Sequence, residues 1–71
     1  MADAAWEALV EEALLAVAPD LEARRLLTQR MHDDGDLAVT YAAWCNGGDH
    51  RSLKRLLVRL AREKTPATGE R

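Results

Sequence analysis

The chain has 71 residues, with 12 acidic and 10 basic side chains and a formal net charge of −2. This length allows one domain with one small core and leaves little room for an extended catalytic cleft. The apolar residues are mostly alanine and leucine, and the aromatic residues are two tryptophans and one tyrosine; this composition favours helices over sheets.

The cellular setting follows from simple features of the sequence. The single cysteine, Cys45, excludes an intramolecular disulfide and is typical of a reducing compartment. No apolar run approaches the roughly 20 residues that span a bilayer, and the N-terminus lacks the pattern of a signal peptide. We therefore expect a cytoplasmic protein that does not bind membranes.

Charge is divided between the two halves of the chain. Residues 1–36 carry nine acidic and three basic side chains, whereas residues 37–71 carry three acidic and seven basic ones. This division predicts two complementary surfaces on one small domain, which favour docking to another protein or to further copies of the chain. The net acidity argues against bulk attraction to nucleic acid, although the basic half permits local attraction.

The first predicted helix begins after Asp3, the expected N-cap, and ends before Pro19. Its apolar residues recur at the spacing of a single helical stripe: Trp6, Leu9, Val10, Ala13, Leu14 and Val17. We expect Trp6 to be structural because it lies within this stripe. Glu7, Glu11 and Glu12 favour the N-terminal half through the helix dipole and keep the outer face polar.

A second helix is predicted to run to about His32, with Pro19 and Asp20 in its first turn. The positions expected to be buried are Ala23, Leu26, Leu27 and Met31, with Leu21 as a further candidate, while Arg24, Arg25 and Arg30 lie partly outward. The turn that follows contains Asp33, Asp34 and Gly35, and the glycine can adopt the left-handed conformation that closes a helix. Asp36 is expected to cap the third helix.

The third predicted helix extends from Leu37 to about Asn46. Apolar residues cover nearly its whole circumference, which predicts the central and most buried helix of the domain. A strand over residues 37–41 is disfavoured by the alanines that follow and by the lack of a partner strand. For Trp44, packing on the core is the favoured interpretation, and the alternative is an anchor for a partner beside the turn that begins at Asn46.

The fourth predicted helix begins after Asn46, Gly47 and Gly48, with Asp49 as its N-cap, and runs to about Lys64. Its expected core face consists of Leu53, Leu56, Leu57, Leu60 and Ala61. Arginines follow the other side at i, i+4, i+8 and i+11, with a lysine beside them: Arg51, Arg55, Arg59, Arg62 and Lys54. Guanidinium groups in this arrangement can bind carboxylates or phosphates.

These segments predict an all-α fold, a compact four-helix bundle formed by residues 1–64 as a single domain. Residues 65–71 are polar and include Pro66 and Gly69. They have no apolar surface to bury, so we expect a flexible, disordered tail or the start of a linker.

The residues that could form a metal or acid–base site are His32, Asp33, Asp34, Asp36, Cys45, Asp49 and His50. Their spacing matches no zinc or calcium pattern. Cys45 could pair with His50 as a nucleophile, but no third group is available to orient the pair. We therefore expect no enzyme, no catalytic residues, no cofactor and no metal.

One family resemblance covers most of the chain. The stretch LVEEALLAVAPDLEARRLLTQRM, followed by the Trp44-Cys45 helix end and by LKRLLVRLAREKTP, resembles the effector-associated, death-like helical adaptor domains of bacterial conflict and signalling systems. Those domains occur at the termini of proteases, NTPases and other effectors. The resemblance implies a death-like bundle that pairs with a like domain on a partner, in bacterial defence or signalling.

The function expected from the sequence is protein–protein interaction through charged helical faces, by a monomer or a weak homo-oligomer. The expected partner-binding residues form a basic surface, an opposed acidic surface and one apolar position: Arg51, Lys54, Arg55, Arg59 and Arg62; Glu7, Glu11 and Glu12; and Trp44. Two alternatives remain open. One is a nucleoid-associated, nucleic-acid-binding modulator, and the other is a small phage-type inhibitor that blocks the basic groove of a larger partner with its acidic half.

Overall fold

The computed structural model describes residues 4–65, which form four α-helices and no strand. The helices are α1 (Ala4–Val17), α2 (Leu21–Asp33), α3 (Asp36–Cys45) and α4 (His50–Lys64). The prediction of an all-α, four-helix fold is confirmed. Asp3 and residues 66–71, on which we placed an N-cap and most of the predicted tail, lie outside the described residues.

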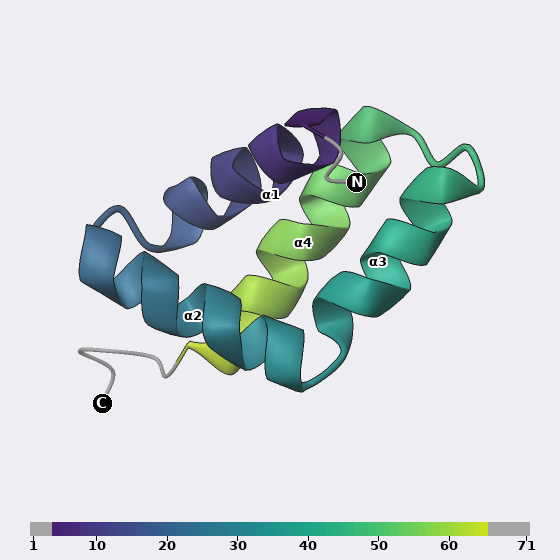
Figure 1. Cartoon of the computed structure of the whole chain (residues 1–71). Coiled ribbons are helices and arrows are strands. Elements are labelled where there is room, and N and C mark those ends of the chain that lie inside the picture. The colour runs from purple at the N-terminus through teal and green to yellow at the C-terminus, as the bar shows by residue number, and fades with distance from the viewer. Residues whose placement is uncertain (1–3, 66–71) are drawn as a thin grey trace.

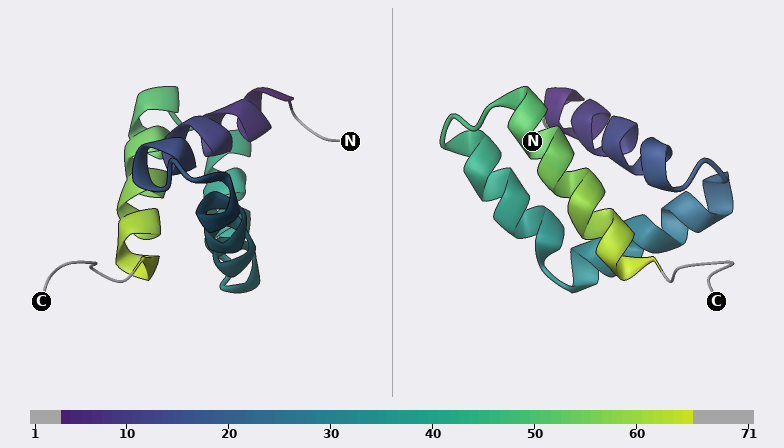
Figure 2. Two further views of the ribbon diagram at one scale, coloured as in Figure 1. Left: turned by 90° about the vertical axis from the view of Figure 1, so that its left-hand side faces the viewer. Right: turned by 180° about the vertical axis from the view of Figure 1, so that it is seen from behind.

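α4 is the helix around which the bundle is arranged. It runs between α1 and α3 in Figure 1 and lies in front of the other helices when the molecule is seen from behind in Figure 2. It packs against all three, most extensively against α1. The core consists of buried side chains from α1, α2 and α4 and from the loop after α1: Leu9, Ala13, Leu14, Ala18, Leu27, Met31, Leu53, Leu57 and Ala61.

The prediction that the third helix is the most buried one is wrong. Thr40 is the only residue of α3 that is fully buried, and its hydroxyl donates to the carbonyl oxygen of Asp36 at 2.6 Å. Val39 is 70% exposed. The alanines of α3 offer little area for burial, whereas α4 places Leu53, Leu57 and Ala61 in one buried row at intervals of four residues.

α2 is rotated relative to the prediction. Leu27 and Met31 are buried as expected, but Ala23 is exposed, and Leu21 and Leu26 are 61% and 68% exposed. Arg24 takes a place on the inner side instead, because its guanidinium donates to the carbonyl oxygens of Ala18 and Pro19 at 3.0 Å each. These two hydrogen bonds satisfy loop carbonyls that would otherwise need water.

Leu56 of α4 was also expected in the core and is exposed at the border of the buried row. Leu60, by contrast, is partly buried and packs against the core. The buried side of α4 is therefore narrower than the leucine spacing predicts.

Asp20 and Asp49 cap the helices that follow them. Asp20 accepts a hydrogen bond from the Ala23 amide, and Asp49 accepts one from the Ser52 amide, each at 3.0 Å. The predicted cap at Asp49 is confirmed. Pro19, which we placed in the first turn of the second helix, lies outside α2, since Asp20 is already the N-cap.

The start of α3 differs from the prediction. Its N-cap is Gly35, which has a φ of +83° and makes no side-chain cap, and Asp36 is the first helical residue. The Asp36 carboxylate is turned toward Lys64 of α4 instead. The expectation that Asp36 caps the third helix is therefore wrong.

Two glycines shape the turn between α3 and α4. Gly47 has a φ of +89°, and its amide donates to the Trp44 carbonyl at 3.1 Å. The Gly48 amide donates to the Ala43 carbonyl at 2.9 Å. A Cβ on Gly48 would lie 2.8 Å from that same carbonyl oxygen and 2.8 Å from Leu53 Cδ1, so this position requires glycine.

Candidate functional site

The basic side chains of α4 gather on its outward side, as the sequence predicts. We call this surface the basic face, and it consists of Arg51, Lys54, Arg55, Arg59 and Arg62. The four arginines are exposed and Lys54 is half-buried. Together with Leu56 and Val58 they line a shallow groove of about 790 Å³ along the helix.

Only part of this charge is compensated within the described part of the chain. Lys54 Nζ lies 3.5 Å from Glu12 Oε1, and Arg59 Nε lies 3.9 Å from Glu63 Oε2. The other three arginines, Arg51, Arg55 and Arg62, form no ion pair with any of residues 4–65. The basic face therefore offers three guanidinium groups to a ligand without first breaking an ion pair described here.

The acidic side chains of α1 do not form a single surface. Glu7 and Glu11, one turn apart, border a groove between α1 and α2, whereas Glu12 faces α4. The division follows from helix geometry, because each residue turns the side-chain direction by about 100°. We call the pair Glu7 and Glu11 the acidic wall. The predicted acidic surface is thus reduced to two residues.

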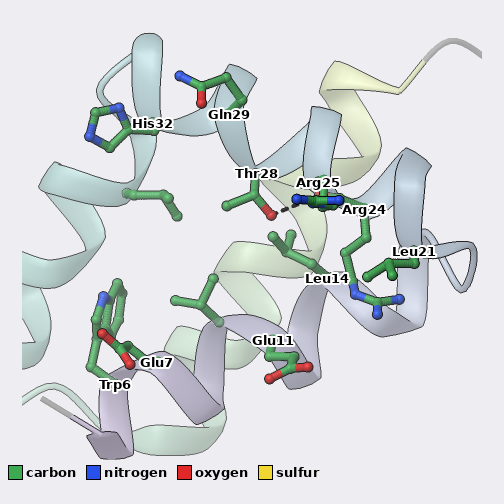
Figure 3. Close-up of a pocket in the computed structure, with 12 residues that line it drawn as sticks. Trp6, Glu7, Glu11, Leu14, Leu21, Arg24, Arg25, Thr28, Gln29 and His32 are labelled. Atoms are coloured by element: carbon green, nitrogen blue, oxygen red, sulfur yellow. Dashed lines mark hydrogen bonds between the residues drawn. The ribbon is translucent and has the colours of Figure 1, made fainter. Parts of the chain in front are cut away.

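The groove between α1 and α2 has a volume of about 700 Å³. Its apolar lining includes Val10, Leu14 and Leu37. Figure 3 shows the two glutamates on the α1 side and Arg25, Thr28, Gln29 and His32 across from them on α2. Sequence reasoning missed this groove, because it depends on the angle at which two helices diverge.

A second charged cluster ties the end of α4 to the corner between α2 and α3. Lys64 Nζ lies 2.7 Å from Asp34 Oδ2 and 3.0 Å from Asp36 Oδ2. The hydrogen bond from Lys64, with its nearby positive charge, holds the pKa of Asp34 below its ordinary value of 3.8. The hydrogen bonds to the two carboxylates raise the pKa of Lys64 above 10.5. These aspartates therefore serve an internal contact and are not free for a partner.

The aromatic side chains form one cluster between α1 and α3. The ring centroids of Trp6 and Tyr41 are 5.3 Å apart with planes at 62°, and those of Trp6 and Trp44 are 5.8 Å apart at 51°. Trp6 and Trp44 are half-buried and pack against the core. Trp44 therefore contributes to packing, which matches the favoured interpretation of this residue.

The residues considered for metal or acid–base chemistry are scattered. Cys45 and His50 are exposed, on either side of the turn between α3 and α4. His32 Nδ1 lies 3.7 Å from Asp33 Oδ1, and both side chains are exposed. Among residues 4–65, no three histidine, cysteine or acidic side chains are grouped so that they could hold a metal ion.

Comparisons with protein-family models, with curated proteins and with solved structures return no significant match to this chain. None of the helices within the described range has the length and apolarity needed to cross a membrane. Function must therefore be inferred from the surfaces themselves, above all from the basic face.

Proposed function

We propose that the chain is a non-enzymatic protein-interaction module, an adaptor that recruits a like domain or an effector through its charged helical faces. The resemblance of its leucine-rich segments to death-like adaptor domains supports this class of function, and with it a cytoplasmic role in bacterial defence or signalling. The observation that carries the proposal is the basic face, on which Arg51, Arg55 and Arg62 remain unpaired within residues 4–65.

The chemistry of the basic face indicates what a partner must offer. Guanidinium groups bind carboxylates in a planar, bidentate manner. Exposed ion pairs each contribute at most about 1 kcal/mol, so three of them alone give an affinity no tighter than about millimolar. Leu56 and Val58 lie in the same groove. A stable partner therefore carries carboxylates together with an apolar side chain that covers these two residues.

A polyanion is the main competing ligand for this surface. The same five basic side chains could meet phosphates along a nucleic-acid backbone. The net charge of −2 opposes such attraction at longer range, so we place protein binding first. The inhibitor alternative is weakened by geometry, since Glu12 faces α4 and the acidic wall contains only two glutamates.

Affinity capture from cells of the source organism, with and without nuclease, tests the proposal. The bait is the whole chain, compared with the variant Arg55→Glu/Arg62→Glu. Its matched control is Arg25→Glu/Arg30→Glu, which makes the same change in charge on α2. We expect a defined protein to be retained after nuclease treatment by the wild type and the control but lost, at least tenfold, by the α4 variant.

The other outcomes are equally informative. Retention of nucleic acid alone, abolished by nuclease, would show that the basic face binds phosphates and would overturn the adaptor proposal. Equal loss in both variants would show that net charge, and not the face of α4, determines capture. The retained protein is then purified and titrated with the chain at about 50 and 300 mM salt. The affinity should be lower at the higher salt concentration, because exposed ionic contacts are screened there.

A further inference from the structure

The basic face and the acidic wall lie on different sides of the molecule. The groove that the acidic wall borders is lined by α1, α2 and the first turn of α3, and no described residue of α4 contributes to it. Figure 2 shows α4 on one side of the bundle, with α2 and α3 on the other. A single molecule therefore cannot bring these two surfaces together, but two molecules can.

The two surfaces have matching spacing. Glu7 and Glu11 are four residues apart on one helix, as are Arg51 and Arg55, and also Arg55 and Arg59. Four residues correspond to a rise of about 6 Å in any α-helix. Two helices laid side by side can therefore align both carboxylates with two successive guanidinium groups, without a change of backbone conformation in either molecule.

Both surfaces are available for such a contact. Glu7 and Glu11 are exposed, and within residues 4–65 neither forms an ion pair. Arg51 and Arg55 are likewise exposed, and neither forms an ion pair within residues 4–65. Other acidic residues are already paired, among them Glu12, Asp34 and Asp36, and they lie elsewhere. These four charges, on Glu7, Glu11, Arg51 and Arg55, are thus of both signs and lie on separate sides of the molecule.

We propose that the like domain recruited by the basic face is a second copy of this chain, bound head to tail, with the α4 arginines of one molecule on the acidic wall of the next. This inference rests on the proposed function and names its partner. Arg25 and His32 line the far side of the groove, so the incoming α4 lies against the α1 side. Leu56 and Val58 of the incoming helix supply the apolar part of the contact.

The geometry of the contact determines the form of the assembly. Each contact uses the basic face of one molecule and the acidic wall of the other, so both end molecules keep one open surface. Such a heterologous contact continues into an open chain unless its rotation closes a ring. Because exposed ion pairs are weak, the assembly gains molecules as the protein concentration rises and loses them as salt is added.

Sedimentation of the purified full chain tests the inference first. At about 20 mM salt, with a long screening distance, we expect the average mass to rise through dimer and trimer as concentration increases. At about 300 mM salt we expect at least a tenfold weaker association. A protein that stays monomeric up to millimolar concentration at low salt, or one that stops at the dimer, would overturn the inference.

A mixing experiment tests the arrangement of the contact. Glu7→Gln/Glu11→Gln removes both carboxylates of the acidic wall, and Arg51→Gln/Arg55→Gln removes two of the three unpaired arginines of the basic face, the two whose spacing matches the acidic wall. Each variant alone should be monomeric. Mixed in equal amounts, they still offer one intact surface each, so we expect dimers of one copy of each variant and nothing larger. Circular dichroism checks that both variants remain helical, which their exposed positions favour.

The variants also separate this inference from the proposed function. If the two variants together form no dimer, or if either alone associates like the wild type, head-to-tail pairing is wrong. If Arg51→Gln/Arg55→Gln loses a captured protein of another kind while the wild type remains monomeric, the adaptor function stands and the self-pairing fails. If that variant keeps every captured protein, the proposed function fails, whatever the mass measurements show.

Discussion

α3 and α4 lie side by side, and each turns one face to solvent, yet they contribute to the fold in different ways. α4 buries Leu53, Leu57 and Ala61 and exposes a row of arginines. α3 fully buries only Thr40 and exposes apolar residues such as Val39. In this bundle, the helix with a clear division between apolar and charged sides packs against all the others, whereas the helix with the higher apolar content is the less buried of the two.

We expect the largest loss of stability from Leu57→Ala in α4, which tests this difference between the two helices. Leu57 is fully buried, and truncation of such a leucine removes apolar burial and leaves a cavity, at a cost of about 3 kcal/mol. A chain of this length has a free energy of unfolding of roughly 4–10 kcal/mol. We expect a large fall in the urea midpoint measured by circular dichroism.

The matched control for this prediction is Val39→Ala in α3. Because Val39 is mostly exposed, its truncation should change the free energy of unfolding by no more than about 0.5 kcal/mol. Equal losses from the two variants would mean that α3 packs as closely as α4 and would remove the contrast between them.

Gly48→Ala tests the junction between the two helices. The new Cβ would meet the Ala43 carbonyl oxygen, which cannot move without disturbing the end of α3, as well as Leu53. Overpacking of this kind costs about 1–3 kcal/mol. Thermal unfolding should show the loss, and a variant with the same melting temperature as the wild type would contradict the close approach at this turn.

Asp49→Ala tests the difference between the N-termini of α3 and α4. α4 has a side-chain N-cap and α3 has none, so only α4 can lose one. Removal of an aspartate cap costs about 1 kcal/mol. Chemical denaturation should show this loss, and Asp49→Asn, which keeps an acceptor oxygen, should restore most of it. Equal destabilisation by both variants would argue that the negative charge matters and the cap does not.

The smallest expected effect concerns the contact that ties α4 to the start of α3. The pKa of Asp34 is lowered, so its contribution to stability is present above pH 3.8 and is lost as pH falls through the folded-state pKa. The pKa of Lys64 is raised, so its contribution is present below pH 10.5 and is lost as pH rises through its folded-state pKa.

Lys64→Met should therefore lower the melting temperature slightly at neutral pH and flatten its decline at both extremes. Melting temperature measured from pH 2 to 11 gives the comparison. Lys54→Met is the control, because Lys54 has a single partner, Glu12, at 3.5 Å. A profile for Lys64→Met that runs parallel to the wild type would show that the pairs at Lys64 contribute nothing to stability.

The sequence predicts the elements of this fold well, because their limits depend on local chemistry. Pro19 cannot continue α1, Asp49 can accept the first amides of α4, and Gly47 can take the positive φ that ends α3. The basic face is predictable for the same reason, since a spacing of four residues places Arg51 and Arg55 on one side of any α-helix.

The errors concern how the helices meet. α2 is rotated because Arg24 reaches back to two loop carbonyls, and Asp36 fails to cap α3 because Lys64 approaches from the far end of the chain. These contacts join segments that helix periodicity treats separately. The sequence alone could have predicted the division of the acidic residues, since adjacent residues such as Glu11 and Glu12 cannot share a helix face. It could not have predicted the groove beside them.

The contact between Trp6 and Trp44 has a practical consequence. Both tryptophans of the chain belong to the single cluster that joins α1 to α3. Their fluorescence therefore monitors the docking of these two helices, whereas far-ultraviolet circular dichroism monitors helix content in all four. If α3 detaches before the rest of the bundle unfolds, the two signals will separate during a denaturant titration, and the order in which the helices are lost can be read without adding a label.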